Sequence, residues 1–210
     1  MIMKRKVAII DTLGAHGGAF HYYSFGQCLG LINANVDVSL YTNNETDNPK
    51  YRGLKFYSFY NNLFDSEFKI INGFRWIFGS IRSILHARLS GVSVFHFHIF
   101  YTNILILLNL ILVKITFGKV VLTIHDVMSF ANNGDSSIIS KLIYKFTDLI
   151  LTHNEFSKSG IIKIEPNLKK HIYIVPHGNY TPFINIRKDK KKSREHLGLH
   201  KDKTILLFFG

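Results

Sequence analysis

The sequence predicts an α/β domain with a Rossmann-like parallel sheet and helices on both faces. Short apolar segments alternate with longer segments of helical periodicity, as in consecutive β-α-β units. Two of the apolar segments, 120–124 and 172–175, are almost continuously apolar, which is typical of strands covered on both faces. Of the 210 residues 47% are hydrophobic and 19% charged, which excludes a disordered chain.

The expected strands are the short apolar runs that end in polar residues or glycines. The first of them is followed by a glycine-rich turn with Gly14, Gly17 and Gly18, and a polar loop follows the second. In chain order, strands are expected at residues 6–11, 36–42, 54–59, 92–98, 120–126, 149–154 and 171–177.

The segments between these strands have helical spacing of apolar residues, and helices are expected at 19–33, 68–90, 102–117, 136–146 and 156–164. The helix at 68–90 is basic and amphipathic, with Arg75 and Arg82 opposite an apolar face of Phe74, Ile77, Phe78, Ile81, Ile84 and Leu85. Segment 97–113 carries no formal charge and approaches the length of about 20 residues that spans a bilayer. Because His98, Asn103 and Asn109 interrupt it, a buried helix is favoured over a transmembrane one.

Three regions are expected along the chain. Residues 1–180 form the Rossmann-like domain, and residues 181–203 form a basic linker that contains the charged run 187–194. Residues 204–210 look like the first strand of a further domain. The single cysteine, Cys28, allows no internal disulfide and favours a reducing, cytoplasmic location.

Histidines stand at the ends of four of the expected strands, at the edge where parallel sheets bind ligands. They are His98, His125 with Asp126, His153 with Asn154, and His177 with Gly178. A histidine at this edge could donate a hydrogen bond to a substrate hydroxyl or carry a proton near neutral pH. This recurrence predicts a ligand site along one rim of the sheet.

Each candidate also has a purely structural interpretation. Gly17 and Gly18 would place backbone amides near an anion at a helix start, or would only form a tight turn. Asp126 could cap the next segment, and one of Asn154, Glu155 and Ser157 is expected to be a helix N-cap. His96 and His98 share one face of a strand, as metal ligands would, although His96 alone is better interpreted as a core histidine. The sequence has no G-x-G-x-x-G fingerprint and no evident nucleophile.

The formal net charge of +12 and the pI of about 9.7 favour anionic partners such as nucleotide phosphates or an acidic membrane face. Nucleic acid is not expected as a partner. Most aromatic residues lie within apolar runs instead of between basic residues, where stacking platforms for bases would be.

Five segments in this order resemble the amino-terminal domain of family 4 glycosyltransferases. They are Gly17-Gly18 after the first strand, 94–98 (VFHFH), 122–126 (LTIHD), 154–158 (NEFSK) and 174–178 (IVPHG). The closing segment 205–210 (ILLFFG) resembles the first strand of that family's carboxyl-terminal domain. The resemblance covers nearly the whole chain but only about the first half of a complete enzyme of this family.

The resemblance implies one lobe of the two-domain GT-B fold. Such enzymes transfer a sugar from a nucleotide-sugar to a glycan or lipid-linked acceptor, usually with retention and without a bound metal or other cofactor. It implies that Gly17 and Gly18 approach the donor and that His125 contacts the transferred sugar as the catalytic residue. It also suggests donor- or acceptor-binding roles for the remaining rim residues, His16, His98, Asp126, Asn154, Ser157, His177 and Gly178.

The family's basic residues for the diphosphate and its paired glutamates lie in the carboxyl-terminal domain, so the chain alone is expected to be inactive. Many relatives act on lipid-linked acceptors in bacterial surface-polysaccharide synthesis, and the helix at 68–90 could then lie on an anionic inner-membrane face. Two alternatives remain open. One is a non-catalytic half-domain that pairs with a separate carboxyl-terminal chain, and the other is a metal hydrolase that uses His96, His98, His125 and Asp126.

Overall fold

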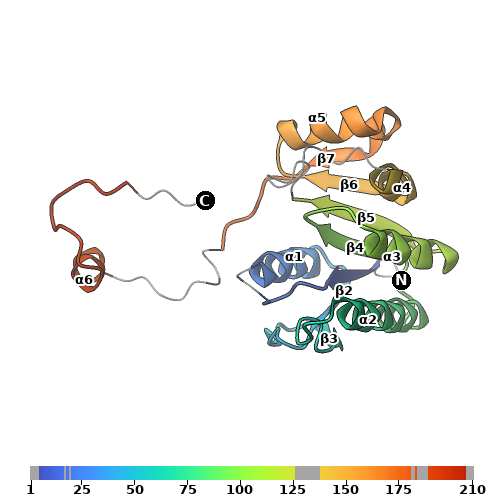
Figure 1. Ribbon diagram of the computed structural model, residues 1–210, viewed down its shortest axis with the longest axis horizontal. Coiled ribbons are helices and arrows are strands. Elements are labelled where there is room, and N and C mark those ends of the chain that lie inside the picture. Colours follow the sequence, from blue (N-terminus) through green and yellow to red (C-terminus); the bar gives the residue numbers. More distant parts are fainter. Residues whose placement is uncertain are drawn as a thin grey trace. The chain divides into compact units, whose positions relative to one another are not determined.

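The computed structural model describes residues 5–16, 18, 20–125, 138–180, 183 and 189–206 (Figure 1). The contacts divide the chain into two units, Met1–Gly178 and Asn179–Gly210. The larger unit holds the whole sheet.

Seven parallel strands form one sheet in the order β3-β2-β1-β4-β5-β6-β7 (Figure 1). Their bounds are β1 Lys6–Asp11, β2 Asp37–Asn43, β3 Leu54–Tyr60, β4 Val94–Ile99, β5 Lys119–Ile124, β6 Leu149–Thr152 and β7 Ile172–Ile174. The chain moves from β1 outwards to β3 and then crosses to β4, on the other side of β1. This reversal creates a crevice beyond the carboxyl ends of β1 and β4, where sheets of this type bind ligands. The predicted Rossmann-like α/β class is confirmed.

The helices of this unit cover both faces of the sheet. Their bounds are α1 His21–Asn33, α2 Lys69–Leu89, α3 Ile104–Ile115, α4 Ile138–Phe146 and α5 Glu155–Ile164, with a 3₁₀ turn, η1 Pro166–His171, before β7. Helix α1 packs on β1 and β2, α2 and α4 flank α3 on the opposite face, and α5 packs beside β7.

Alternation along the central strands gives the two faces different chemistry. In β4, Phe95 and Phe97 enter the main hydrophobic core, which also includes Leu110 of α3 and Ile143 of α4. The alternate residues of β4, His96 and His98, face α1, where both contact Gln27. One face of the sheet is therefore an ordinary core, and the face under α1 becomes polar towards the carboxyl ends of the strands.

Helix α2 packs mainly through small residues, and of the apolar face that the sequence predicted only Ile84 is fully buried. Gly79, Ser80 and Ser83 are buried with Ile84 and Ala87, whereas Phe74, Phe78, Ile81 and Leu85 are exposed. A Cβ atom at Gly79 would lie 2.6 Å from Cδ1 of Tyr60, so only glycine allows this close approach. The prediction for Phe74, Phe78, Ile81 and Leu85 was wrong because the helix lies close to the sheet on its small side.

Helix α3 occupies the uncharged segment. Asn103 caps it by accepting a hydrogen bond from the amide of Ile106 at 2.9 Å, and Leu107, Asn109, Leu110 and Val113 are buried. Within the described part of the chain, no helix combines the length and apolarity needed to cross a bilayer.

The second unit contains the seven-residue helix α6 (Lys190–His196), whose N-cap Asp189 accepts from the amide of Lys192. The basic run predicted as a linker is thus partly helical. Thr204–Leu206 form no strand, and residues 207–210 of the predicted closing strand lie outside the described residues.

Candidate active site

The loop after β1 is held by a buried polar cluster at the crevice. The Asp11 carboxylate accepts from the amide of Gly14 at 2.8 Å and from the hydroxyl of Ser24 at 2.6 Å. Burial raises the pKa of Asp11, and these two hydrogen bonds offset part of that rise. Asn43 of β2 donates to the carbonyl oxygen of Leu13 at 2.7 Å. The loop therefore has a fixed course across the top of β1.

The path of this loop requires a glycine at position 14. Its φ of +51° lies in the left-handed region, and a Cβ atom there would come within 2.0 Å of Oγ1 of Thr46. Of the predicted glycine pair, Gly18 is exposed, and a Cβ atom added to it would meet nothing within 4 Å. Gly17 lies outside the described residues.

The histidines at the strand ends form one continuous cluster. Nε2 of His125 lies 3.4 Å from Nδ1 of His98, and Nδ1 of His125 lies 3.2 Å from Nε2 of His153. The ring of His177 lies 4.8 Å from that of His153, centroid to centroid. The structure thus brings His98, His125, His153 and His177 together along the ends of β4 to β7. His153 was noted in the sequence but was not among its candidate site residues.

Helix α1 covers this cluster with residues that the sequence analysis did not assign to the site. The ring of Tyr23 lies 4.9–5.5 Å from those of His98, His125, His153 and His177, and Phe20 contacts His98 and His125. The Gln27 amide lies 3.0 Å from Nε2 of His98 and 3.2 Å from Nδ1 of His96. Tyr23 and Gln27 of α1 and its N-cap, Phe20, lie on one side of the helix. A polar glutamine among these aromatic residues was the one feature of the sequence that could have indicated their place in the site.

Burial keeps the imidazoles of His96, His98 and His125 neutral. It lowers the pKa of His125 to about 3 and that of His96 to about 4, and the neighbouring histidines lower His125 further. The pKa of His98 is also well below its ordinary value, for the same reasons. Near pH 7 these three rings can therefore accept or donate hydrogen bonds without adding positive charge.

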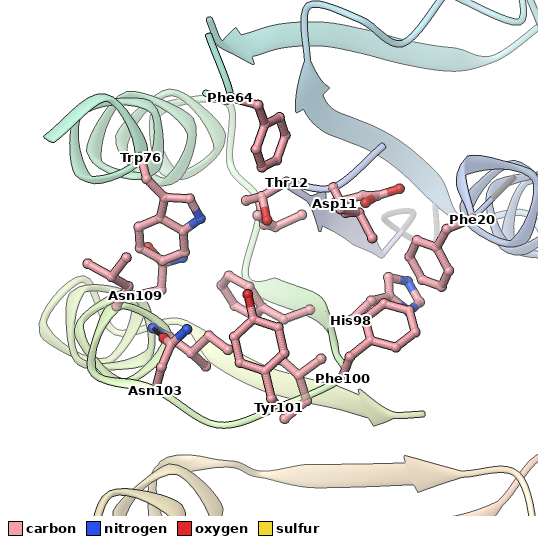
Figure 2. A pocket seen from close by; sticks show the side chains of 16 residues that line it. Asp11, Thr12, Phe20, Phe64, Trp76, His98, Phe100, Tyr101, Asn103 and Asn109 are labelled. Carbon is pink, nitrogen blue, oxygen red and sulfur yellow. Dashed lines mark hydrogen bonds between the residues drawn. The ribbon is translucent and has the colours of Figure 1, made fainter. Parts of the chain in front are cut away.

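A cavity of about 180 Å³ opens beside the cluster, above the ends of β1 and β4. Figure 2 shows Phe20 and His98 on one side of it and Trp76 with two asparagines on the opposite side. The lining is mainly aromatic and apolar, with a few polar groups (Asp11, Thr12, Asn103 and Asn109). This is the composition of a site for a small organic ligand whose orientation is fixed by a few hydrogen bonds.

The remaining predicted residues have other positions. His16 lies 2.9 Å from the Glu45 carboxylate and stacks on Phe64, which lines the cavity. Asn154 is the N-cap of α5 and accepts from the amide of Ser157 at 2.8 Å, which explains both residues structurally. Gly178 accepts from Nδ1 of His177 through its carbonyl oxygen at 2.6 Å. Asp126 lies outside the described residues.

The metal set proposed from sequence is not the one that the structure assembles. His96 and His98 are engaged with Thr123 and Gln27. Among the described residues, the group with ligand atoms close enough for a metal ion is instead His125, His153 and His177.

Comparison with known proteins finds relatives at the level of structure alone. No family model and no curated protein sequence matches the chain. Among solved structures, UDP-N-acetylglucosamine 2-epimerase from Rickettsia bellii superposes with a TM-score of 0.60 at 12% identity, over 94% of this chain and 52% of that protein.

Two further neighbours are transferases or synthases by name. Sucrose-phosphate synthase from Thermosynechococcus elongatus has a TM-score of 0.59 at 12% identity, over 95% of this chain and 54% of its own. The lipopolysaccharide outer core galactosyltransferase WaaB has a TM-score of 0.54 at 9% identity, with 81% and 45% covered.

The fold is Rossmann-like and of the GT-B type. The chain spans about half the length of each of these neighbours. At these identities the likeness establishes the architecture and leaves the reaction to be argued from the site.

Proposed function

We propose that the chain is the amino-terminal, acceptor-side half of a retaining family 4 glycosyltransferase that acts in bacterial surface-polysaccharide synthesis. The observation that carries the proposal is the line of histidines at the ends of β4 to β7, with His125 neutral near pH 7, next to an aromatic cavity at the β1–β4 crevice. The order of the sequence motifs and the GT-B fold support the same interpretation.

In this proposal the acceptor occupies the aromatic cavity. Aromatic side chains such as Trp76 and Tyr101 provide flat apolar faces for a sugar ring or a lipid, and Asn103 and Asn109 provide hydrogen bonds that orient it. His98 lines both the cavity and the histidine cluster, so an acceptor in the cavity lies beside His125.

The donor is a nucleotide-sugar that lies over the rim, with Gly17 and Gly18 near it and the transferred sugar at His125. A neutral His125 can hydrogen-bond to a sugar hydroxyl, and its aromatic neighbours keep water from the reacting bond. The reaction needs no metal in this scheme, because a separate carboxyl-terminal domain, in the same or a partner polypeptide, supplies the positive groups that stabilise the leaving diphosphate.

We also propose that the cytoplasmic face of the membrane holds the enzyme near a lipid-linked acceptor. Helix α2 exposes Phe74 by 69% and Phe78 by 70%, and Phe68, Ile70, Ile71, Ile81, Leu85 and Leu89 are exposed as well. The same helix carries Lys69, Arg75, Arg82 and Arg88, which suit an anionic bilayer. Trp76 of the cavity belongs to this helix, so the proposed lipid contact and the acceptor site are adjacent.

Fluorescence of the single tryptophan tests the acceptor site on the chain itself. Trp76 lines the cavity, so a polyprenyl-diphosphate sugar or an oligosaccharide that enters it should quench or shift the emission. Tyr101→Ala, in the lining, should weaken the response, whereas Tyr173→Ala, exposed on β7, should not. A panel of lipid-linked and free glycans that leaves the emission unchanged would contradict the proposal.

A further inference from the structure

We propose that His125, His153 and His177 form a binding site for a divalent transition metal ion, with Zn²⁺ as the preferred ion. The ligand nitrogens of these three side chains all lie within 4.8 Å of one another. Three imidazoles with an open fourth position are a common zinc ligand set. The inference concerns metal binding alone and holds whether or not the chain transfers sugar.

The hydrogen bonds at the outer end of the cluster fix one of the ligand nitrogens. Nδ1–H of His153 donates to the carbonyl oxygen of Val175 at 2.8 Å, so the lone pair of a neutral His153 is on Nε2. Nδ1–H of His177 likewise donates to the carbonyl oxygen of Gly178 at 2.6 Å. Such outer hydrogen bonds to carbonyl groups are what orients metal-binding histidines.

The hydrogen bonds at the inner end fix a second ligand nitrogen. Nε2–H of His98 donates to Oε1 of Gln27 at 3.0 Å, so Nδ1 of His98 accepts from Nε2–H of His125 at 3.4 Å. The lone pair of His125 is then on Nδ1. The amide nitrogen of Gln27 donates to Nδ1 of His96, and Nε2–H of His96 donates to Oγ1 of Thr123.

The hydrogen bonds assigned from the two ends of this network therefore leave two acceptor nitrogens facing each other, with no hydrogen atom between them. Nδ1 of His125 and Nε2 of His153 lie 3.2 Å apart, and each directs a lone pair at the other. Only a cation between them satisfies both. Two nitrogens bound to one tetrahedral Zn²⁺ at 2.0–2.1 Å are about 3.3–3.4 Å apart, close to the observed spacing.

The third histidine favours a metal ion over a shared proton as that cation. A proton bridges two nitrogens, whereas a ring nitrogen of His177 also lies within 4.8 Å of the ligand nitrogens of His125 and His153. The ligands stand at the ends of paired strands: the amide of His125 donates to Ile99 of β4, and that of Val175 donates to Thr152 of β6. Paired backbone at these positions holds the three rings in place before a metal arrives.

Occupation of the site would also regulate the proposed reaction. A metal on Nδ1 of His125 engages the ring that the proposed function assigns to the transferred sugar. This consequence, unlike metal binding itself, rests on the proposed function, and it predicts that Zn²⁺ inhibits transfer.

Titration of the metal-free chain with Zn²⁺, followed by calorimetry, tests the site directly. We expect one Zn²⁺ per chain, with binding at least about tenfold weaker in His177→Ala and His153→Ala. Removal of a group that only hydrogen-bonds to a metal ligand already weakens binding about tenfold or more, so removal of a ligand should weaken it at least as much. His177 is exposed, so its replacement should leave the fold intact, which circular dichroism checks. Co²⁺ in place of Zn²⁺ should give the visible absorption of a tetrahedral site.

His200→Ala is the matched control, because it removes an exposed histidine from the second unit. It should bind Zn²⁺ as the unaltered chain does. The proposal is overturned if no stoichiometric Zn²⁺ binds, as expected if the Gln27 amide is rotated and the histidines satisfy one another without a cation. It is also overturned if His177→Ala and His153→Ala bind as tightly as the unaltered chain.

Discussion

Gly14 is the residue on which the loop over β1 depends most. Its backbone has a positive φ, and Thr46, Thr42 and Asn43 leave no space for a side chain. Replacement by alanine must strain the backbone and push apart the polar cluster that holds Asp11.

We therefore expect Gly14→Ala to lower the free energy of unfolding by about 1–3 kcal/mol, measured by urea denaturation. Gly30→Ala is the control, because Gly30 lies within α1 with nothing within 4 Å of the added atom. That change should be neutral or stabilising by up to about 1 kcal/mol. Equal stability of the two variants would refute the account of the loop.

The neutral histidines make the fold sensitive to acid. Burial lowers the pKa values of His96 and His125 to about 4 and about 3, whereas in the unfolded chain they titrate near 6.5. The unfolded state therefore binds more protons below pH 6.5. The stability that these residues contribute is complete above that pH and is lost as the pH falls towards 4.

Each such histidine should remove about 1.4 kcal/mol of stability per pH unit between roughly pH 6 and pH 4. Denaturant unfolding at pH 7, 6 and 5 with a chelator present measures this slope. His96→Gln, which cannot titrate, should have a shallower slope. A stability that does not change over this range would contradict the lowered pKa values, because it would mean that His96 and His125 bind protons equally in the folded and unfolded states.

At the scale of elements, hydrophobic periodicity predicted which segments are helices and strands, and mostly placed their ends within two residues. Periodicity failed to predict features that depend on how the elements pack against one another. Apolar spacing in α2 could not show that Gly79 and its serine neighbours face the sheet, because small residues carry almost no periodic signal. The strand predicted at 171–177 is only Ile172–Ile174, since η1 precedes it and the chain then leaves the sheet.

The exposed face of α2 makes a prediction of its own. Phe74→Ser with Phe78→Ser should reduce co-sedimentation with phosphatidylglycerol vesicles at least tenfold, because each buried phenylalanine contributes about 1.5–3 kcal/mol. Phe156→Ser on α5 is the matched control, as Phe156 is also exposed, by 73%. Neutral phosphatidylcholine vesicles should bind the unaltered chain weakly. If the double variant binds the vesicles as well as the unaltered chain, the exposed face of α2 does not contact the membrane.

At the scale of the whole molecule, the sheet order creates the site. Because β4 follows β3 in the chain but pairs with β1, the loops after β1 and β4 diverge, and the cavity forms between them. Histidines at strand ends could be predicted from sequence once the strands were assigned. The contribution of Gln27 and Tyr23 could not, because it depends on how α1 crosses the sheet and no local pattern records that packing.

The most direct test of the central claim is release of nucleoside diphosphate from a panel of nucleotide-sugars, assayed with this chain together with the carboxyl-terminal domain that the proposed function requires. We predict release from at least one member of the panel, and a loss of about 100-fold or more in His125→Ala, which is the lower end of the range for a group that assists at the reacting centre. His200→Ala should retain full activity. Unchanged turnover in His125→Ala, or no release from any nucleotide-sugar by the folded protein, would contradict the account.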